Sequence, residues 1–335
     1  MWFKNLRLFC LTQEFNLSVE ELEAQLIENA FIPCTSYEKS CIGWVSPLGN
    51  AAFLSEDEGN KPMLTHVVGD YIMLCAQKQD RLLPATVVRE ATDEKVGEIE
   101  HRQARKIYRK ERREIQDDVF SSLLPRAFTR SARIHAYIAV KEKLLVVDTA
   151  TAPKAEDFLN LLRDTLGSFP VALPDSKREP GSVMTQWLKN QKATDKFEIH
   201  DDCQLVNPQD QTNIVRCKSQ DLISDEIQSH LSAGKHVSQL GVLWNSILSC
   251  AIDTDLAIKR LRFDTMKEEA ESFEEVEALV NLSGNISILT NKTYDEFLNK
   301  NFYKMCYIFT ALFVRFGFLE NIFIESYYIS YGWKG

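Results

Sequence analysis

The sequence predicts an α+β protein in which a helical segment interrupts one sheet-containing unit and a second such unit follows. Strand-like runs lie on both sides of a stretch, residues 84–124, that has helical character. The chain has 335 residues, more than the roughly 250–300 at which single cores stop growing, so two or three cores are expected. Its 44% hydrophobic and 26% charged residues are typical of soluble globular proteins.

The first unit begins with a strand and a capped helix. Residues 2–11 are rich in Phe and Leu and predict a buried strand. Ser18 precedes Glu21 by three residues, ahead of an apolar stripe, which is the pattern of a capping box. A Gly-Asp turn between residues 66–68 and 71–75 predicts a β-hairpin.

The helical segment is predicted to be an insertion. Pro84 suits a first helical turn, and no Pro recurs before Pro125. One helix of that length would run about 60 Å, so we expect a break into two or three helices near Lys110. Strand patterns return at residues 134–148, followed by a helix at 154–166, so the helices are predicted to interrupt one α+β domain.

The later part of the chain predicts a second α+β unit. Helices are expected at residues 182–188 and 224–233, with a strand at 214–218 between them. Three further runs predict an antiparallel meander, at residues 237–244, 246–252 and 257–263.

A basic segment is the strongest functional signal. Residues 101–116 hold seven basic and two acidic side chains in a chain of net charge −9. The seven are Arg102, Arg105, Lys106, Arg109, Lys110, Arg112 and Arg113. On one helix, Arg102, Lys106, Arg109 and Arg113 would form a stripe, with Arg105, Arg109 and Arg112 beside it. Stacked like charges cost helix stability, and Arg grips phosphate with a planar fork, so nucleic acid is the predicted partner. A solvated helix face is the alternative that composition leaves open.

The end of the helical segment combines aromatic and basic residues. Phe128 follows a helix-ending Pro and is flanked by Arg126 and Arg130. An exposed aromatic beside Arg is typical of an interface anchor. The alternative is that Phe128 caps the small core of the helices.

No catalytic constellation is recognisable in the sequence. Gly234-Lys235 lacks the earlier glycine of a phosphate-binding loop. His200-Asp201-Asp202-Cys203 is expected to form a strand-to-helix turn rather than a metal site. Trp44 and Trp187 are expected in the core. No cofactor, metal or enzymatic activity is therefore predicted.

Cysteine spacing and the absence of targeting signals predict a cytoplasmic protein. The eight cysteines include no Cys-x-x-Cys pair, and a zinc site or disulfide framework would need tighter spacing. They are expected as reduced, mostly buried thiols. No signal peptide is recognisable, and the longest apolar run, residues 305–314, is too short to cross a bilayer.

Taken together, these segments resemble the RdgC family of bacterial recombination-associated proteins. The matching stretches occur in the order of the family and extend to about residue 290. They are residues 2–5, 43–49, 103–106, 122–128, 154–157, 166–168, 219–222, 233–235 and 259–263.

The resemblance implies a ring-shaped homodimer that encircles double-stranded DNA without sequence preference. Members of the family restrain the RecA recombinase, so a nucleoid-associated protein is expected. The resemblance divides the chain into a central α+β domain (1–76 and 132–172), an inserted helical tip (77–131), an α+β base (173–290) and an atypical aromatic-rich tail (291–335). DNA would contact the seven basic residues above and Arg130.

The resemblance also implies the dimer contacts. Arg126 and Phe128 would meet the partner at the contact between the two tips, which we call the gate, and Ser219 and Gln220 would lie near it. The family often has Lys where Ser219 stands. Two alternatives stay open from the residues themselves: a metal-dependent nucleic-acid-processing enzyme such as a nuclease, and an adaptor whose basic helices dock an acidic protein.

Overall fold

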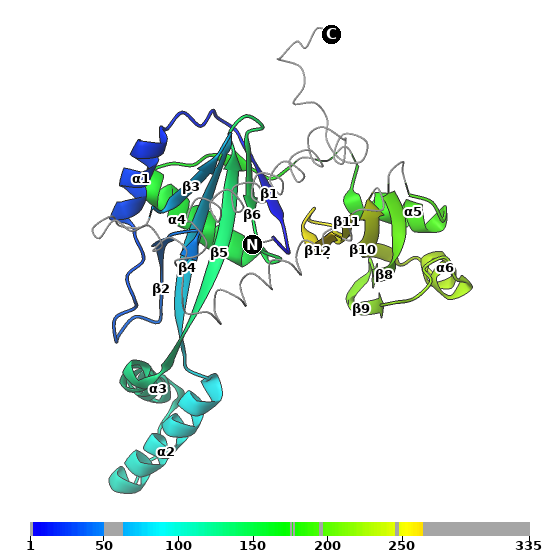
Figure 1. Ribbon diagram of the computed structural model, residues 1–335. Coiled ribbons are helices and arrows are strands. Elements are labelled where there is room, and N and C mark those ends of the chain that lie inside the picture. The colour runs from blue at the N-terminus through cyan, green and yellow to red at the C-terminus, as the bar shows by residue number, and fades with distance from the viewer. Residues whose placement is uncertain are drawn as a thin grey trace, which may run out of the picture.

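The structure contains two antiparallel sheets, and the first carries two helices beside it (Figure 1). The computed structural model describes residues 3–49, 63–174, 176, 178–193, 197–244 and 248–263. The strand order is β2-β4-β5-β6-β1-β7, with β3 paired to β4. The strands are β1 (Arg7–Leu11), β2 (Ser40–Val45), β3 (Thr65–Val68), β4 (Tyr71–Leu82), β5 (Phe128–Ala139), β6 (Leu144–Val147) and β7 (Val171–Ala172).

Two helices, α1 (Val19–Glu28) and α4 (Ala152–Leu166), lie together beside this sheet (Figure 1). The predicted capping box is confirmed, because the Glu21 amide donates to Ser18 Oγ and the Ser18 amide donates to Glu21 Oε2. The hairpin predicted around the Gly-Asp turn is confirmed as β3 and β4. The predicted N-terminal strand is shorter than expected and begins at Arg7.

The core between these helices and the sheet is centred on Trp44. Its ring meets that of Phe158 edge to face, with centroids 5.3 Å apart, and its indole N–H donates to Thr165 Oγ1 at 2.8 Å. Trp44 is 1% exposed, so its predicted core position is confirmed. A buried aromatic pair with a satisfied polar handle fixes α4 on the sheet.

The second sheet has the order β12-β11-β10-β8-β9. Its strands are β8 (Phe197–Asn207), β9 (Asp210–Cys217), β10 (His236–Trp244), β11 (Leu248–Asp253) and β12 (Ile258–Phe263), and its helices are α5 (Pro180–Lys189) and α6 (Asp225–Ser232). The predicted meander is confirmed as β10, β11 and β12. Trp187 on α5 is buried, as predicted.

The prediction of a turn at His200–Cys203 is wrong, because these residues lie within β8. Cys203 pairs in register with Cys217 on β9 and is buried. Phe197, Ile199, Cys203 and Leu205 share one face of β8, but Asp201 and Asp202 interrupt the apolar alternation in the sequence, so the strand was not recognisable.

A second core lies between the two sheets and is shared by them. Apolar side chains from β1, β4, β5 and β6 of the first sheet belong to the same buried cluster as side chains of α5, α6 and the second sheet. Leu6 and Ile258 form a backbone bridge between the two units, and Arg7 pairs with Asp255 at 3.6 Å.

A helical hairpin projects from the end of the first sheet (Figure 1). β4 and β5 stay paired from Tyr71 opposite Ala139 to Leu82 opposite Phe128, forming a long ribbon. Between them the chain forms α2 (Ala85–Gln103), α3 (Arg109–Leu123) and a short 3₁₀ turn, η2 (Leu124–Arg126). The predicted insertion of helices between two parts of one sheet is therefore observed.

Two sequence expectations concern other features of the chain. Cys34 and Cys41 form a disulfide, so the prediction that all eight cysteines are reduced is wrong. The aromatic-rich tail, residues 291–335, lies outside the described residues. No helix in the described part of the chain is long and apolar enough to cross a membrane.

Candidate nucleic-acid interface

The helical hairpin has a small core of its own. Val88 and Val96 of α2 pack with Ile115 and Val119 of α3, and all four are buried. Partly buried side chains extend this cluster toward the turn and toward the ribbon. The opposite faces of both helices are left to solvent, so their charges can act on a ligand.

The break between the helices comes earlier than predicted. α2 ends at Gln103, and Ala104 adopts a left-handed conformation with φ of 49°. The Ile107 amide donates to Glu100 Oε1 at 2.7 Å, which fixes the turn. Tyr108 then becomes the N-cap of α3, leaving its ring 78% exposed.

This break makes the prediction of continuous basic stripes wrong. Arg102 belongs to α2, Arg105 and Lys106 lie in the turn, and the other four basic residues lie on α3. All seven remain exposed. They are gathered around one end of a two-helix unit instead of following one face of a single helix.

Two of the seven are held by acidic neighbours. Arg105 contacts both carboxylate oxygens of Glu111, at 2.5 and 2.7 Å, and donates to Gln103. This hydrogen bonding lowers the pKa of Glu111 and raises the pKa of Arg105. Arg112 pairs with Asp93 across the two helices. These two arginines therefore also serve the internal order of the hairpin.

The side chains of the other five make no hydrogen bond or ion pair to another residue in the described part of the chain. They are Arg102, Lys106, Arg109, Lys110 and Arg113. Three of these five, Arg109, Lys110 and Arg113, lie in the first turns of α3, where the positive end of the helix dipole already disfavours positive charge. The arrangement costs stability and favours an anion, and Arg and Lys in this setting bind phosphate oxygens.

The root of the hairpin carries a second group of exposed residues. Phe128 is 84% exposed at the end of β5 and lies opposite Leu82, which is 48% exposed. It therefore does not cap the helical core. Arg126 and Arg130 are exposed beside it. An apolar pair flanked by cations can form a contact surface.

Arg133 is a cation that sequence reasoning missed. It is exposed on β5 and donates to Gln77 Oε1 at 3.3 Å. It comes three positions after Arg130 on the same strand, so the two point to opposite faces of the ribbon. If residues 128–133 had been recognised as part of a strand, the sequence would have indicated that Arg133 is a further exposed cation.

Ser219 and Gln220 lie on the second unit, in the turn between β9 and α6. Ser219 has φ of 51°, and the Gln220 side chain donates to Glu226 at 2.9 Å. Figure 1 shows β9 and α6 well apart from α3. Within a single chain, the turn that holds Ser219 and Gln220 is therefore not brought together with Arg126 and Phe128.

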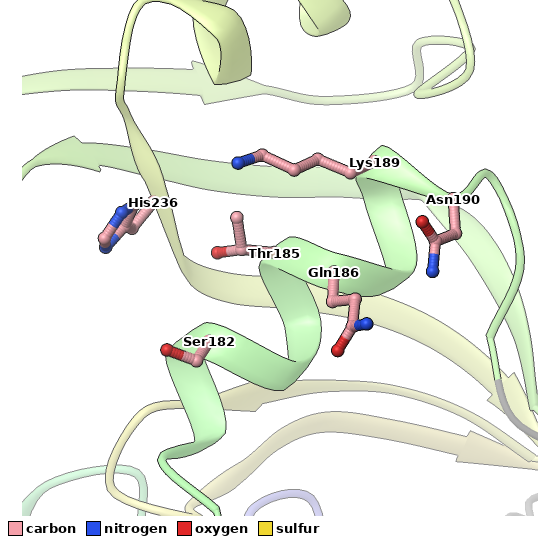
Figure 2. Close-up of a pocket in the computed structure, with 6 residues that line it drawn as sticks. All are labelled: Ser182, Thr185, Gln186, Lys189, Asn190 and His236. Carbon is pink, nitrogen blue, oxygen red and sulfur yellow. The ribbon is translucent and has the colours of Figure 1, made fainter.

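A polar hollow of about 390 Å³ lies beside α5, and Figure 2 shows its lining. The described lining consists of Ser182, Thr185, Gln186, Lys189, Asn190 and His236. Thr185 Oγ1 is already engaged, since it donates to Gly181 O and accepts from the Val237 amide. Within the described ranges, no group of three His, Cys, Asp or Glu side chains is placed to hold a metal ion.

Fold and site together define an α+β protein of two packed antiparallel sheets that carries a cation-rich helical hairpin. The chain belongs to the RdgC family: the family model described as "Putative exonuclease, RdgC" matches residues 1–300.

Curated relatives extend the match. The recombination-associated protein RdgC of Pseudomonas aeruginosa (strain PAO1) is 42% identical over 299 residues, covering 89% of this chain and 95% of the relative. RdgC of Pseudomonas fluorescens (strain Pf0-1) is 41% identical with the same coverage. RdgC of Pseudomonas syringae pv. syringae is 41% identical over 303 residues, covering 90% and 96%.

Proposed function

We propose that the protein is a non-enzymatic, sequence-independent double-stranded DNA-binding protein that acts in recombination. The observation that carries the proposal is the group of five exposed cations at the turn end of the hairpin, whose side chains have no partner among the described residues, in a chain of net charge −9. An acidic protein that concentrates unpaired cations in one place is suited to a polyanion held at that place. The names of the relatives, which associate them with recombination, favour DNA as that polyanion.

The kind of contact follows from the side chains involved. Lysines and arginines on an exposed turn reach phosphates, and phosphate contacts position a protein on DNA but carry no sequence information. A homodimer would present two hairpins to one duplex and so double the five cations. In a ring, both hairpins would line the hole. Phe128 and Arg126 would form the contact between the two tips (the gate), and Ser219 and Gln220 of the second unit would lie near it.

Restraint of RecA is the proposed consequence of occupying the duplex. A protein that coats double-stranded DNA competes with a recombinase for the same substrate. In a RecA strand-exchange reaction, added protein should slow exchange, and excess unrelated duplex should restore it. Inhibition that persists with excess duplex would point to direct contact with RecA and would contradict simple competition.

The experiment that tests DNA binding is fluorescence-anisotropy titration of two unrelated duplexes at several salt concentrations. A dimer that makes about six to ten phosphate contacts should lose about three to five decades of affinity between 50 and 200 mM salt. Equal affinities and this steep slope are expected. A strong preference for one sequence, or a flat salt dependence, would contradict the proposal.

An exonuclease is the second candidate, favoured by the description of the family model. The two functions differ in what happens to the DNA. With Mg²⁺ or Mn²⁺ present, a binding protein leaves end-labelled duplex intact and protects it stoichiometrically. Shortening that increases with time and falls on addition of a chelator would establish the enzyme instead.

A further inference from the structure

A disulfide lies beside the root of the DNA-binding hairpin. Cys34 and Cys41 are linked, with α-carbons 5.5 Å apart, within the usual range for disulfides. Both are half-buried, and most residues between them are exposed. We call residues 32–41 the buttress loop. The two disulfide-bonded residues are therefore partly open to solvent.

The buttress loop is joined to β4 at three successive residues. The Cys34 amide donates to Gln79 Oε1 at 2.9 Å. Ser40 Oγ donates to Asp80 Oδ1 at 2.7 Å. The Arg81 amide donates to Lys39 O at 2.9 Å. The loop therefore follows β4 to the point where the strand approaches the helical hairpin.

The same loop also reaches the hairpin itself. The Lys39 ammonium lies 5.9 Å from the centre of the Phe120 ring on α3. Phe120 in turn packs against the small core of the two helices. A cation over an aromatic face is a weak attraction, so it depends on the loop being held in place.

The Arg81 guanidinium connects the two sides. Toward the loop it donates to Thr35 O at 3.0 and 3.2 Å and to Cys34 O at 3.5 Å. Toward the hairpin it donates to Leu124 O at 3.4 Å and Ala127 O at 3.3 Å. One rigid fork with five donors thus bridges the disulfide-bearing loop and the end of α3.

We propose that Cys34–Cys41 is a thiol–disulfide exchange site that sets how firmly the helical hairpin is anchored. A thiolate of a dithiol reductant attacks one sulfur and breaks the S–S bond, forming a mixed disulfide. The second thiol of the reductant then displaces the protein sulfur. Two electrons and two protons pass to the protein, which gains two thiols, while the reductant leaves as a disulfide.

Reduction loosens the hairpin because it increases the conformational freedom of the buttress loop. Without the cross-link, the buttress loop samples more conformations, and the carbonyls of Cys34 and Thr35 are no longer held ready for Arg81. The hairpin has only a small core, so its opening depends strongly on such anchoring. The reduced protein therefore has a more loosely held hairpin on an unchanged sheet.

The test is amide hydrogen exchange, followed by mass spectrometry, on the full chain after treatment with glutathione disulfide or with dithiothreitol. Peptide mapping should find the Cys34–Cys41 link after oxidation. Amides of α2 and α3 should then exchange at least about threefold faster in the reduced protein, while β5 peptides of the core do not change. No DNA is present, so this result is independent of the proposed function.

Three variants sharpen the test. Cys34→Ser/Cys41→Ser should exchange like the reduced protein under both conditions. Cys10→Ala, a control at a free cysteine, should keep the redox response of the wild type. Arg81→Lys should loosen the hairpin even when oxidised, because Lys lacks the fork. Absence of the link, or equal hairpin exchange in both redox states, would overturn the proposal.

Discussion

The helical hairpin and the sheet that carries it differ in how much buried structure holds them. Among the residues that the structure describes, the core between the first sheet and its two helices contains twenty buried residues, whereas the hairpin core contains four. The sheet therefore provides rigidity, and the hairpin presents charge. A unit with so small a core depends on its anchor points, which are the paired ribbon and the Arg81 fork. Binding groups on such a unit can adjust to a ligand.

The largest expected effect comes from the sheet core. Phe158→Ala removes a fully buried ring that packs on Trp44 and should lower the free energy of unfolding by about 3–5 kcal/mol. Urea unfolding measures the loss. Leu173→Ala, at a side chain that is 65% exposed, is the control and should change stability by less than about 0.5 kcal/mol. Similar losses in both variants would contradict the assignment of the core.

The second effect is a pH dependence of the same core. His135 on β5 is buried, and burial first, then the charge of Arg133, lowers its pKa to about 4. The folded state thus keeps the imidazole neutral, while the unfolded chain takes up a proton near its ordinary pKa of about 6.5. The stabilisation from this difference is complete above pH 6.5 and is lost as the pH falls toward 4.

The size of this effect is up to about 3 kcal/mol, since each pKa unit corresponds to about 1.36 kcal/mol. Urea unfolding of the wild type and of His135→Gln at pH 7.5 and at pH 4 isolates it. The stability difference between the two proteins should shift by that amount in favour of the variant at low pH. A difference that does not change with pH would show that His135 is not the group responsible.

A third variant addresses the hairpin core. Ile115→Ala should cost about 2 kcal/mol at this small site and raise amide exchange in α2 and α3 about 30-fold. The main urea transition, which reports the sheets, should hardly move. Gln116→Ala, an exposed neighbour on α3, is the control. If Ile115→Ala lowers the stability reported by the main transition by the whole of this cost, the hairpin and the sheet unfold as one unit. The distinction between a rigid sheet and a loosely held hairpin would then be wrong.

The smallest effect on folding is expected at Phe128. Because its ring is 84% exposed, Phe128→Ala should change the stability of the chain by less than about 0.5 kcal/mol. It should nevertheless weaken the proposed contact between the two tips. The variant protein should then retain linear and circular DNA in a different proportion from the wild-type protein. Tyr37→Ala, at another ring that is 81% exposed, is the control. Equal DNA retention by Phe128→Ala and wild type would argue against a tip gate.

Local signals in the sequence predicted much of the fold. The capping box at Ser18 and the hairpin of β3 and β4 depend on neighbouring residues only, and both were recognisable. The left-handed Ala104 was not, because a Gly or Asn usually marks such a position and here the turn depends on Ile107 and Glu100. Local rules cannot detect an anchor of that kind.

The same limit applies to the candidate site. The seven basic residues could be found from composition, but their separation into paired and unpaired cations required the positions of Asp93 and Glu111. The roles of Arg81 and of the Cys34–Cys41 disulfide depend on β2 and β4 lying side by side. Such roles come from strand pairing between distant segments, which the spacing of residues does not reveal.

The most direct measurement compares two charge-reversal variants in duplex binding. Arg102→Glu/Arg109→Glu/Arg113→Glu changes three of the five hairpin cations that have no side-chain partner among the described residues. Lys154→Glu/Lys189→Glu/Lys192→Glu makes the same change of net charge elsewhere. We predict that the hairpin variant binds two unrelated duplexes at least about 100-fold more weakly at 50 mM salt, with a flatter salt slope, while the control loses less than about fivefold. Equal losses in the two variants would contradict the account, because net charge rather than the hairpin would then govern binding.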